Sequence, residues 1–161
     1  MANKAVIPVF FGLLVCFAGC GPKEIPIDEV KHPESLTAAT LAATGDMEVA
    51  LEALYSGQPP ADSRLEPARC LLLTESGFVR LSSAERTAMV QENNQVGGAV
   101  RELARAGMAK AAEAAAAGRA EEAQQWKDRV ATLGAELADP RHTKLMQLVG
   151  QAIQKLAAST P

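Results

Sequence analysis

Apolar side chains recur at helical spacing along much of the chain, most regularly in its C-terminal third. In the segment 119–138 they follow one another at intervals of three and four residues, at Ala123, Trp126, Val130, Leu133 and Leu137. This spacing predicts an amphipathic helix whose apolar face must be covered by the rest of the protein. A last helix follows Asp139-Pro140, and the face that we expect it to bury carries Leu145, Val149, Ala152 and Leu156.

Proline and glycine residues divide the N-terminal half into shorter helices, because proline favours the first turn of a helix and glycine its end. We expect one helix over 33–43 and a second over 46–57, with Asp46 as its N-cap. The segment 58–63 is a loop by composition, and a short helix follows it over 67–77.

The longest helical stretch begins where Ser82 and Glu85 have the spacing of a capping box, and it reaches Ala117. Gly97-Gly98 interrupts this stretch. A glycine inside a helix costs about 1 kcal/mol relative to alanine, so we expect either a bend or very close packing at this point.

Composition supports an all-α fold, a small helical bundle of five or six helices. Only 4% of the residues are aromatic, and alanine, the best helix former, is abundant. The alternation of three- and four-residue steps favours shallow, nearly antiparallel helix crossings. A core built from alanine with a few leucines is thin, which predicts modest stability or a partner that completes it.

The first twenty residues have the pattern of an export signal. Lys4 precedes an apolar run over 5–17 that is shorter than the roughly 20 residues of a membrane-spanning helix. The run ends in Phe17-Ala18-Gly19-Cys20. In these residues the chain resembles bacterial lipoprotein precursors, in which a small residue and a glycine or alanine precede the modified cysteine.

The resemblance implies cleavage before Cys20 and fatty acyl chains, such as palmitate, attached there. It places the protein on the cell membrane or the outer membrane, facing the periplasm or the exterior, and Gly21 favours the outer membrane. Two or more acyl chains hold a protein stably at a bilayer. An ordinary signal peptide, cut nearby to release a soluble protein, is the alternative.

The expected organisation is a signal peptide over 1–19, a lipid-attached tether over 20–33 and a helical domain over 34–161. Recurring prolines make the tether extended. In the alternative arrangement, its aliphatic residues lie back on the domain as an arm. They are Ile25, Ile27 and Val30.

Charge and candidate chemistry exclude several classes of function. The formal net charge is −3 with no basic stripe, so nucleic acid is not an expected partner. Once Cys20 carries lipid and Cys16 leaves with the signal, Cys70 beside a leucine run is a buried hydrophobe rather than a catalytic thiol. The two histidines, His32 and His142, lack the spacing of metal ligands, and we expect His142 at a solvated helix end.

We therefore predict no enzyme activity, no cofactor and no metal site. Trp126 belongs to the apolar stripe and is expected in the core. Arg101 and Arg105 share a helix face, which is a solvated surface or, alternatively, an anion-binding one. Glycine-initiated turns at 44–51 and 117–123 look like those of tetratricopeptide hairpins, although the two glycines are not a whole number of 34-residue periods apart.

The sequence thus predicts a lipid-anchored, non-catalytic envelope protein with an interaction or structural role at the membrane surface. A protein partner, or self-association, would cover its apolar stripes. The alternatives are a ligand-binding domain, with a groove between the long central helix and the last two helices, and a tetratricopeptide-like adaptor.

Overall fold

The computed structural model describes residues 35–58 and 67–159, and every named element in this part of the chain is an α-helix. The all-α fold predicted from the sequence is confirmed. The helices are α1 (Ser35–Thr44), α2 (Met47–Ser56), α3 (Arg69–Leu72), α4 (Glu75–Arg80), α5 (Ser83–Ala116), α6 (Ala120–Leu137) and α7 (Lys144–Ser159). The predicted signal peptide over 1–19, with Cys20 and the tether over 20–33, lies outside the described residues.

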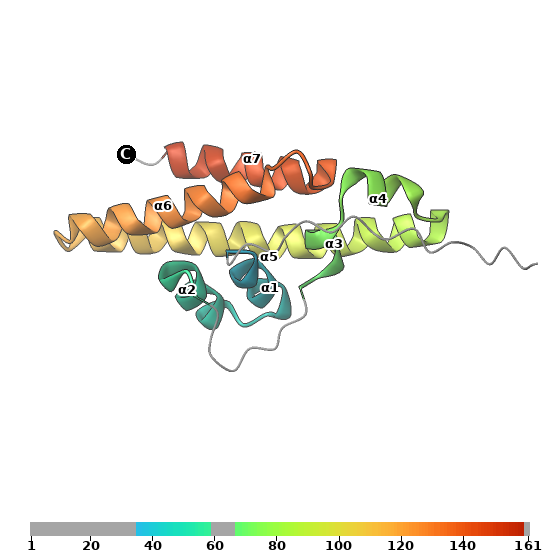
Figure 1. Ribbon diagram of the computed structural model, residues 1–161. Helices are drawn as coiled ribbons and strands as arrows, with labels where there is room; N and C mark the ends of the chain where they lie inside the picture. The colour runs from blue at the N-terminus through green and yellow to red at the C-terminus, as the bar shows by residue number, and fades with distance from the viewer. Residues whose placement is uncertain (1–34, 59–66, 160–161) are drawn as a thin grey trace, which may run out of the picture.

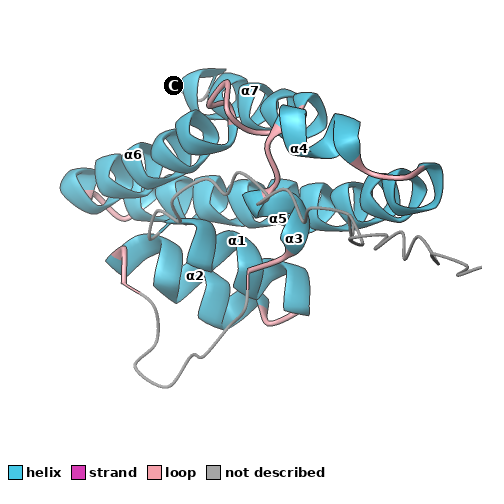
Figure 2. Cartoon of the chain, turned by 45° about the vertical axis from the view of Figure 1, so that its right-hand side comes forward, coloured by secondary structure: helices cyan, strands magenta, loops and turns pink. Residues whose placement is uncertain are grey.

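Helix α5 is the central element of the bundle. The α1–α2 hairpin packs against one side of it, and α6 and α7 lie on the other side (Figures 1 and 2). Successive helices α5, α6 and α7 reverse direction at each turn, so α5 and α7 run the same way (Figure 1). Any groove between α5 and α7 would therefore be bordered by two parallel helices.

Local signals place the helix ends close to where the sequence predicted them. Ser82 and Glu85 form both bonds of the capping box: Glu85 Oε2 accepts from Ser82 N at 2.8 Å, and Ser82 Oγ accepts from Glu85 N at 3.3 Å. Asp46 caps α2 by accepting from the amide of Val49. The turns before α2 and α6 contain Gly45 and Gly118 with positive φ, a conformation that suits glycine.

The segment expected to form one short helix over 67–77 forms two, which brings the helices in the described residues to seven. Leu73 is extended, with φ −73° and ψ 129°. Thr74 then caps α4 by accepting a hydrogen bond from the amide of Gly77 at 3.1 Å. Gly77 therefore lies in the first turn of α4, where the sequence pattern placed a helix end.

Gly97 and Gly98 lie inside one continuous helix of 34 residues. Gly97 is buried, and a Cβ atom there would lie 3.0 Å from Cγ2 of Val149 in α7. Of the two outcomes expected for this glycine pair, close packing is therefore the one observed at Gly97.

The core lies where α5 meets α6, α7 and the α1–α2 hairpin. The apolar stripe predicted for α6 is buried along its whole length. Trp126 within it packs on Tyr55 of α2, with the ring centroids 4.6 Å apart. On α5 the buried positions include several small residues, among them Ala104, Gly107, Ala111 and Ala114.

The two glycine-turn hairpins differ in size. Helices α1 and α2 have 10 residues each, whereas α5 has 34 and α6 has 18. Equal repeat units, as in a tetratricopeptide array, would give hairpins of similar length.

Candidate functional site

Helix α7 buries a different face from the one that its apolar spacing predicted. The face that α7 buries includes Met146, Gly150 and Ile153. The reason is the contact with α6: a Cβ atom at Gly150 would lie 2.6 Å from the carbonyl oxygen of Gly134. A glycine at the point of closest approach adds nothing to a hydropathy pattern, so the pattern selected a neighbouring face.

The predicted face is left wholly or partly open to solvent. Leu145 is 38% exposed, and Leu148, which was not among the residues of the predicted face but lies beside it, is 61% exposed. Ala152 is exposed as well, while Val149 and Leu156 are half-buried against the core. We refer to these residues as the α7 stripe: Leu145, Leu148, Val149, Ala152 and Leu156.

A further exposed hydrophobe lies on α4, which stands beside the N-terminal end of α7 (Figure 1). Val79 is 62% exposed. Glu75, one turn earlier on the same helix, accepts a hydrogen bond from the backbone amide of Lys144 at 2.8 Å. The exposed large hydrophobic residues of the described chain are therefore confined to α4 and α7.

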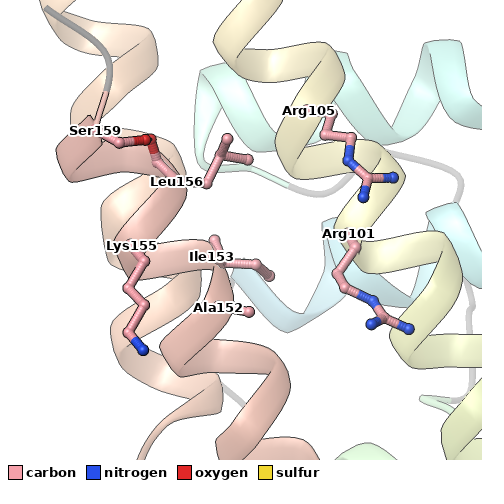
Figure 3. A pocket seen from close by; sticks show the side chains of 7 residues that line it. All are labelled: Arg101, Arg105, Ala152, Ile153, Lys155, Leu156 and Ser159. Carbon is pink, nitrogen blue, oxygen red and sulfur yellow. The ribbon is translucent and has the colours of Figure 1, made fainter.

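A groove of about 360 Å³ lies between α5 and the C-terminal half of α7. Figure 3 shows Ile153 and Leu156 pointing from α7 toward α5 between two cationic rims. Its lining residues are Arg101, Arg105, Ala152, Ile153, Lys155, Leu156 and Ser159. The groove continues the α7 stripe, because Ala152 and Leu156 belong to both.

The rims of this groove are positively charged. Arg101 donates through Nε to the carbonyl oxygen of Gly97 at 3.0 Å, which holds its stem along α5. Arg105 forms an ion pair with Glu102 on the solvent side of α5. Lys155 forms no ion pair with any described residue, and the sequence of α7 contains no carboxylate. Both arginines are exposed, as the prediction of a solvated face required.

His142 is the clearest departure from the site predictions. It was expected at a solvated helix end, but it is only 1% exposed. The turn before α7 directs it inward: the guanidinium of Arg141 pairs with Asp139, and Thr74 of the α3–α4 junction forms a β-bridge with His142. The prediction failed because this packing joins segments far apart in the sequence.

Burial controls the protonation of His142. Its Nδ1 has no hydrogen-bond partner among the described residues. Loss of solvent lowers the pKa of the imidazole, and the charge of Arg141 lowers it further, while Asp139 acts in the opposite direction. The carbonyl oxygen of His142 accepts a hydrogen bond from Gln147 Nε2 at 2.7 Å, which fixes the turn.

Two other buried polar groups were not anticipated from the sequence. Asn93 on α5 is buried, and neither atom of its amide has a partner within the described part of the chain. Burial raises the pKa of Glu136 on α6. Asn93 interrupts the apolar face of α5, and that interruption is the one signal in the sequence that could have marked it. Glu136 is half-buried beside the apolar face of α6, so the sequence pattern does not mark it.

Cys70 lies in the core, as predicted. Burial, reinforced by the negative charge of Glu92, raises the pKa of its thiol to about 12. The thiol is therefore protonated at physiological pH, and a thiolate nucleophile is not formed. Over residues 35–58 and 67–159, no group of three or more His, Cys, Asp or Glu side chains is placed to hold a metal ion.

None of the described helices is both long and apolar enough to cross a membrane. No protein-family model matches the chain, and no curated protein or solved structure does so either.

Proposed function

We propose that this chain is a lipid-anchored, non-catalytic protein of the bacterial envelope whose helical domain binds a protein partner through the α7 stripe. The lipid is attached at Cys20, and the domain faces the periplasm or the exterior from the cell membrane or the outer membrane. The motif Phe17-Ala18-Gly19-Cys20 supports the anchor, and the open face of α7 supports the partner.

The observation that carries the proposed partner is the exposure of Leu145 and Leu148 within a stripe of helical spacing. An apolar stripe on a helix normally faces a core. Burying a whole leucine side chain contributes about 1.5–3 kcal/mol, so covering this stripe would supply useful binding energy. Contiguous exposed apolar surface commonly marks a site of protein interaction.

The anchor is tested by mass spectrometry of the protein isolated from bacterial membranes. We expect cleavage before Cys20 and the added mass of acyl chains on that residue. A Cys20→Ala variant should lose both the acyl mass and the membrane association, whereas Cys70→Ala should keep them. An unmodified thiol at Cys20 in the wild-type protein would refute the anchor.

The partner is tested by crosslinking in the cell. A photoreactive amino acid at position 148 should give a discrete crosslinked protein band, and the same residue at Gln125, exposed on α6, should not. A Leu145→Glu substitution should abolish the band without lowering the amount of folded protein. Crosslinks that are equal from both positions would exclude the stripe as a specific interface.

Ligand binding is a second candidate, because the groove between α5 and α7 lies close to where the sequence placed one. Its volume of about 360 Å³ falls near the lower end of the range for small-molecule pockets. In that case the crosslinked band should be absent, and a small anionic molecule should co-purify with the protein and be lost in an Arg101→Ala variant.

A further inference from the structure

We infer that the partner presents an acidic amphipathic helix, which lies lengthwise on the α7 stripe with its carboxylates between Lys155 and the two arginines of α5. This inference rests on the proposed function, since it names the chemistry of the partner at the same surface. Three features of the surface carry it: its length, its charge and the recess between its rims.

The length and spacing of the stripe suit a helix. From Leu145 to Leu156 the rise of α7 is about 16 Å, or three helical turns. Its apolar residues recur at intervals of three and four, the spacing that a second helix requires for lengthwise packing. An amphipathic helix in an apolar groove is a common mode of protein recognition, with anchors at the same intervals.

The charge of the surface selects an acidic partner. Arg101 and Arg105 form one rim of the groove and Lys155 the other (Figure 3). Lys144 lies at the other end of the stripe, where the carboxylate of Glu75 on α4 accepts from its backbone amide and offsets part of its charge. Helix α7 itself has no carboxylate. Glu102 offsets part of the positive charge through its pair with Arg105. Carboxylates flanking an apolar stripe would complete the pattern on the partner side.

The same charges argue against a second copy of the chain. In a symmetric dimer the identical patch on each copy faces its mate. Two α7 stripes would then bring the lysines and arginines of both copies together without a carboxylate from either α7. Like charges opposed across an interface cost several kcal/mol, which disfavours this pairing.

The surface also differs from one built for a lipid bilayer. Helices that lie in a membrane interface commonly bury tryptophan or phenylalanine, and α7 has no aromatic residue. Ile153 is buried and Leu156 half-buried, whereas Arg101, Arg105 and Lys155 on the two sides of the groove are exposed, so the apolar residues form its floor. A single helix can enter such a recess, whereas a broad membrane surface would meet the rims first.

The experiment measures fluorescence anisotropy of designed peptides with the full-length chain in zwitterionic detergent. One peptide has leucines at three- and four-residue steps flanked by glutamates, and the other has lysines in place of the glutamates. We expect the acidic peptide to bind at least about tenfold more tightly than the basic one.

Charge reversal of the rim supplies the decisive comparison. The double substitution Arg101→Glu, Arg105→Glu should weaken binding of the acidic peptide at least about tenfold and strengthen binding of the basic one. The matched control is Arg86→Glu, Lys110→Glu, which changes the charge of α5 equally at two exposed positions outside the groove. It should alter binding less than about twofold, with circular dichroism confirming that both variants are folded.

Any of several results would overturn the inference. If the acidic peptide does not bind, or if both peptides bind equally well, the partner is not an acidic helix. Rim-dependent binding of phosphatidylglycerol vesicles without peptide binding identifies a lipid surface. A dimer in size-exclusion chromatography that Leu148→Glu dissociates identifies a second copy. Strong peptide binding that appears only after deletion of residues 21–30 shows that the chain's own segment occupies the stripe and that no partner helix is required.

The crosslinking and peptide-binding results together distinguish an error about the acidic helix from an error about the protein partner. If the crosslink from position 148 persists while both peptides fail to bind, the chain has a protein partner at the stripe that is not an acidic helix. If the crosslink is absent as well, the stripe has no protein partner, and the proposed function fails with the inference.

Discussion

Gly150 of α7 and Gly134 of α6 lie backbone against backbone. A Cβ atom at Gly150 would lie 2.6 Å from the carbonyl oxygen of Gly134 and 2.3 Å from the amide nitrogen of Ala138. A Cβ atom at Gly134 would in turn lie 2.9 Å from the amide nitrogen of Gln154. This approach sets the rotation of α7 about its own axis, and through that rotation it leaves Leu145, Leu148 and Ala152 of the α7 stripe exposed.

We predict that Gly150→Ala destabilises the protein by about 1–3 kcal/mol or more, because the added methyl group meets backbone atoms that cannot turn aside. Urea unfolding followed by circular dichroism measures the change in free energy. The matched control is Gly98→Ala on α5, where a Cβ atom would meet nothing within 4 Å. That substitution should stabilise the helix by about 0.5–1 kcal/mol. Equal effects of the two would contradict the close approach.

Stability should fall as the pH drops below the ordinary histidine pKa of 6.5, because the pKa of buried His142 is lowered from that value. Between the unfolded and folded pKa values the unfolded chain binds a proton that the folded chain does not. The contribution of uncharged His142 to the free energy of unfolding is therefore fully present above the unfolded-state pKa. It is lost as the pH falls through the folded-state pKa. Urea unfolding at several pH values from about 7.5 to about 5 measures this slope.

Two carboxyl groups also have shifted pKa values, and each changes the stability in a different pH range or in the opposite direction. Pairing with Arg141 lowers the pKa of Asp139 to about 2, so its contribution is lost only at more acidic pH. Burial raises the pKa of Glu136, so its contribution to stability decreases as the pH rises. A His142→Gln variant should flatten the slope near neutrality. If His32→Gln flattens it instead, the assignment to His142 is wrong.

Cys70 should resist alkylation in the folded protein. Its thiol is buried and its pKa is raised to about 12, so almost none of the reactive thiolate is present at pH 8. Mass spectrometry after iodoacetamide treatment should find Cys70 unmodified in buffer and modified in urea. Rapid alkylation of the folded chain would show that this side chain is accessible.

Tyr55 should control the fluorescence of Trp126, the single tryptophan of the chain. Their rings are in contact, with centroids 4.6 Å apart. Tyr55→Ala should shift the tryptophan emission to longer wavelength by admitting water, and it should lower stability by at least about 1 kcal/mol. Tyr55→Phe retains the ring and should preserve both properties. Unchanged emission in the alanine variant would argue against this packing of α2 on α6.

Local patterns were sufficient to predict most of the helices. The stripe through Trp126 and Val130 on α6 is buried as predicted, because five regularly spaced apolar residues leave one possible inner face. The capping box at Ser82 and Glu85 marks the start of α5, because its bonds join residues three apart in the chain. Such interactions are complete within a few residues, so a sequence pattern contains them in full.

The candidate site could be predicted only in part. The exposure of Arg101 and Arg105 and the burial of Cys70 agree with the sequence-based expectations. The inward position of His142 does not, because it depends on Thr74, which lies far from it in the chain. The residues that line the groove could not be predicted, because they depend on how α5 and α7 align along their length. These two parallel helices are not consecutive in the sequence.

The sequence by itself determined the helical class, the spacing of the apolar stripes and the motif that predicts a lipid at Cys20, since each depends on residues close together in the chain. Tertiary structure decided which side of α7 faces inward. Gly134 and Gly150 bring two backbones together, and the rotation that this requires turns Leu148 outward. Steric contact between helices, rather than the amount of apolar surface on either one, therefore selected the face of α7 that remains exposed.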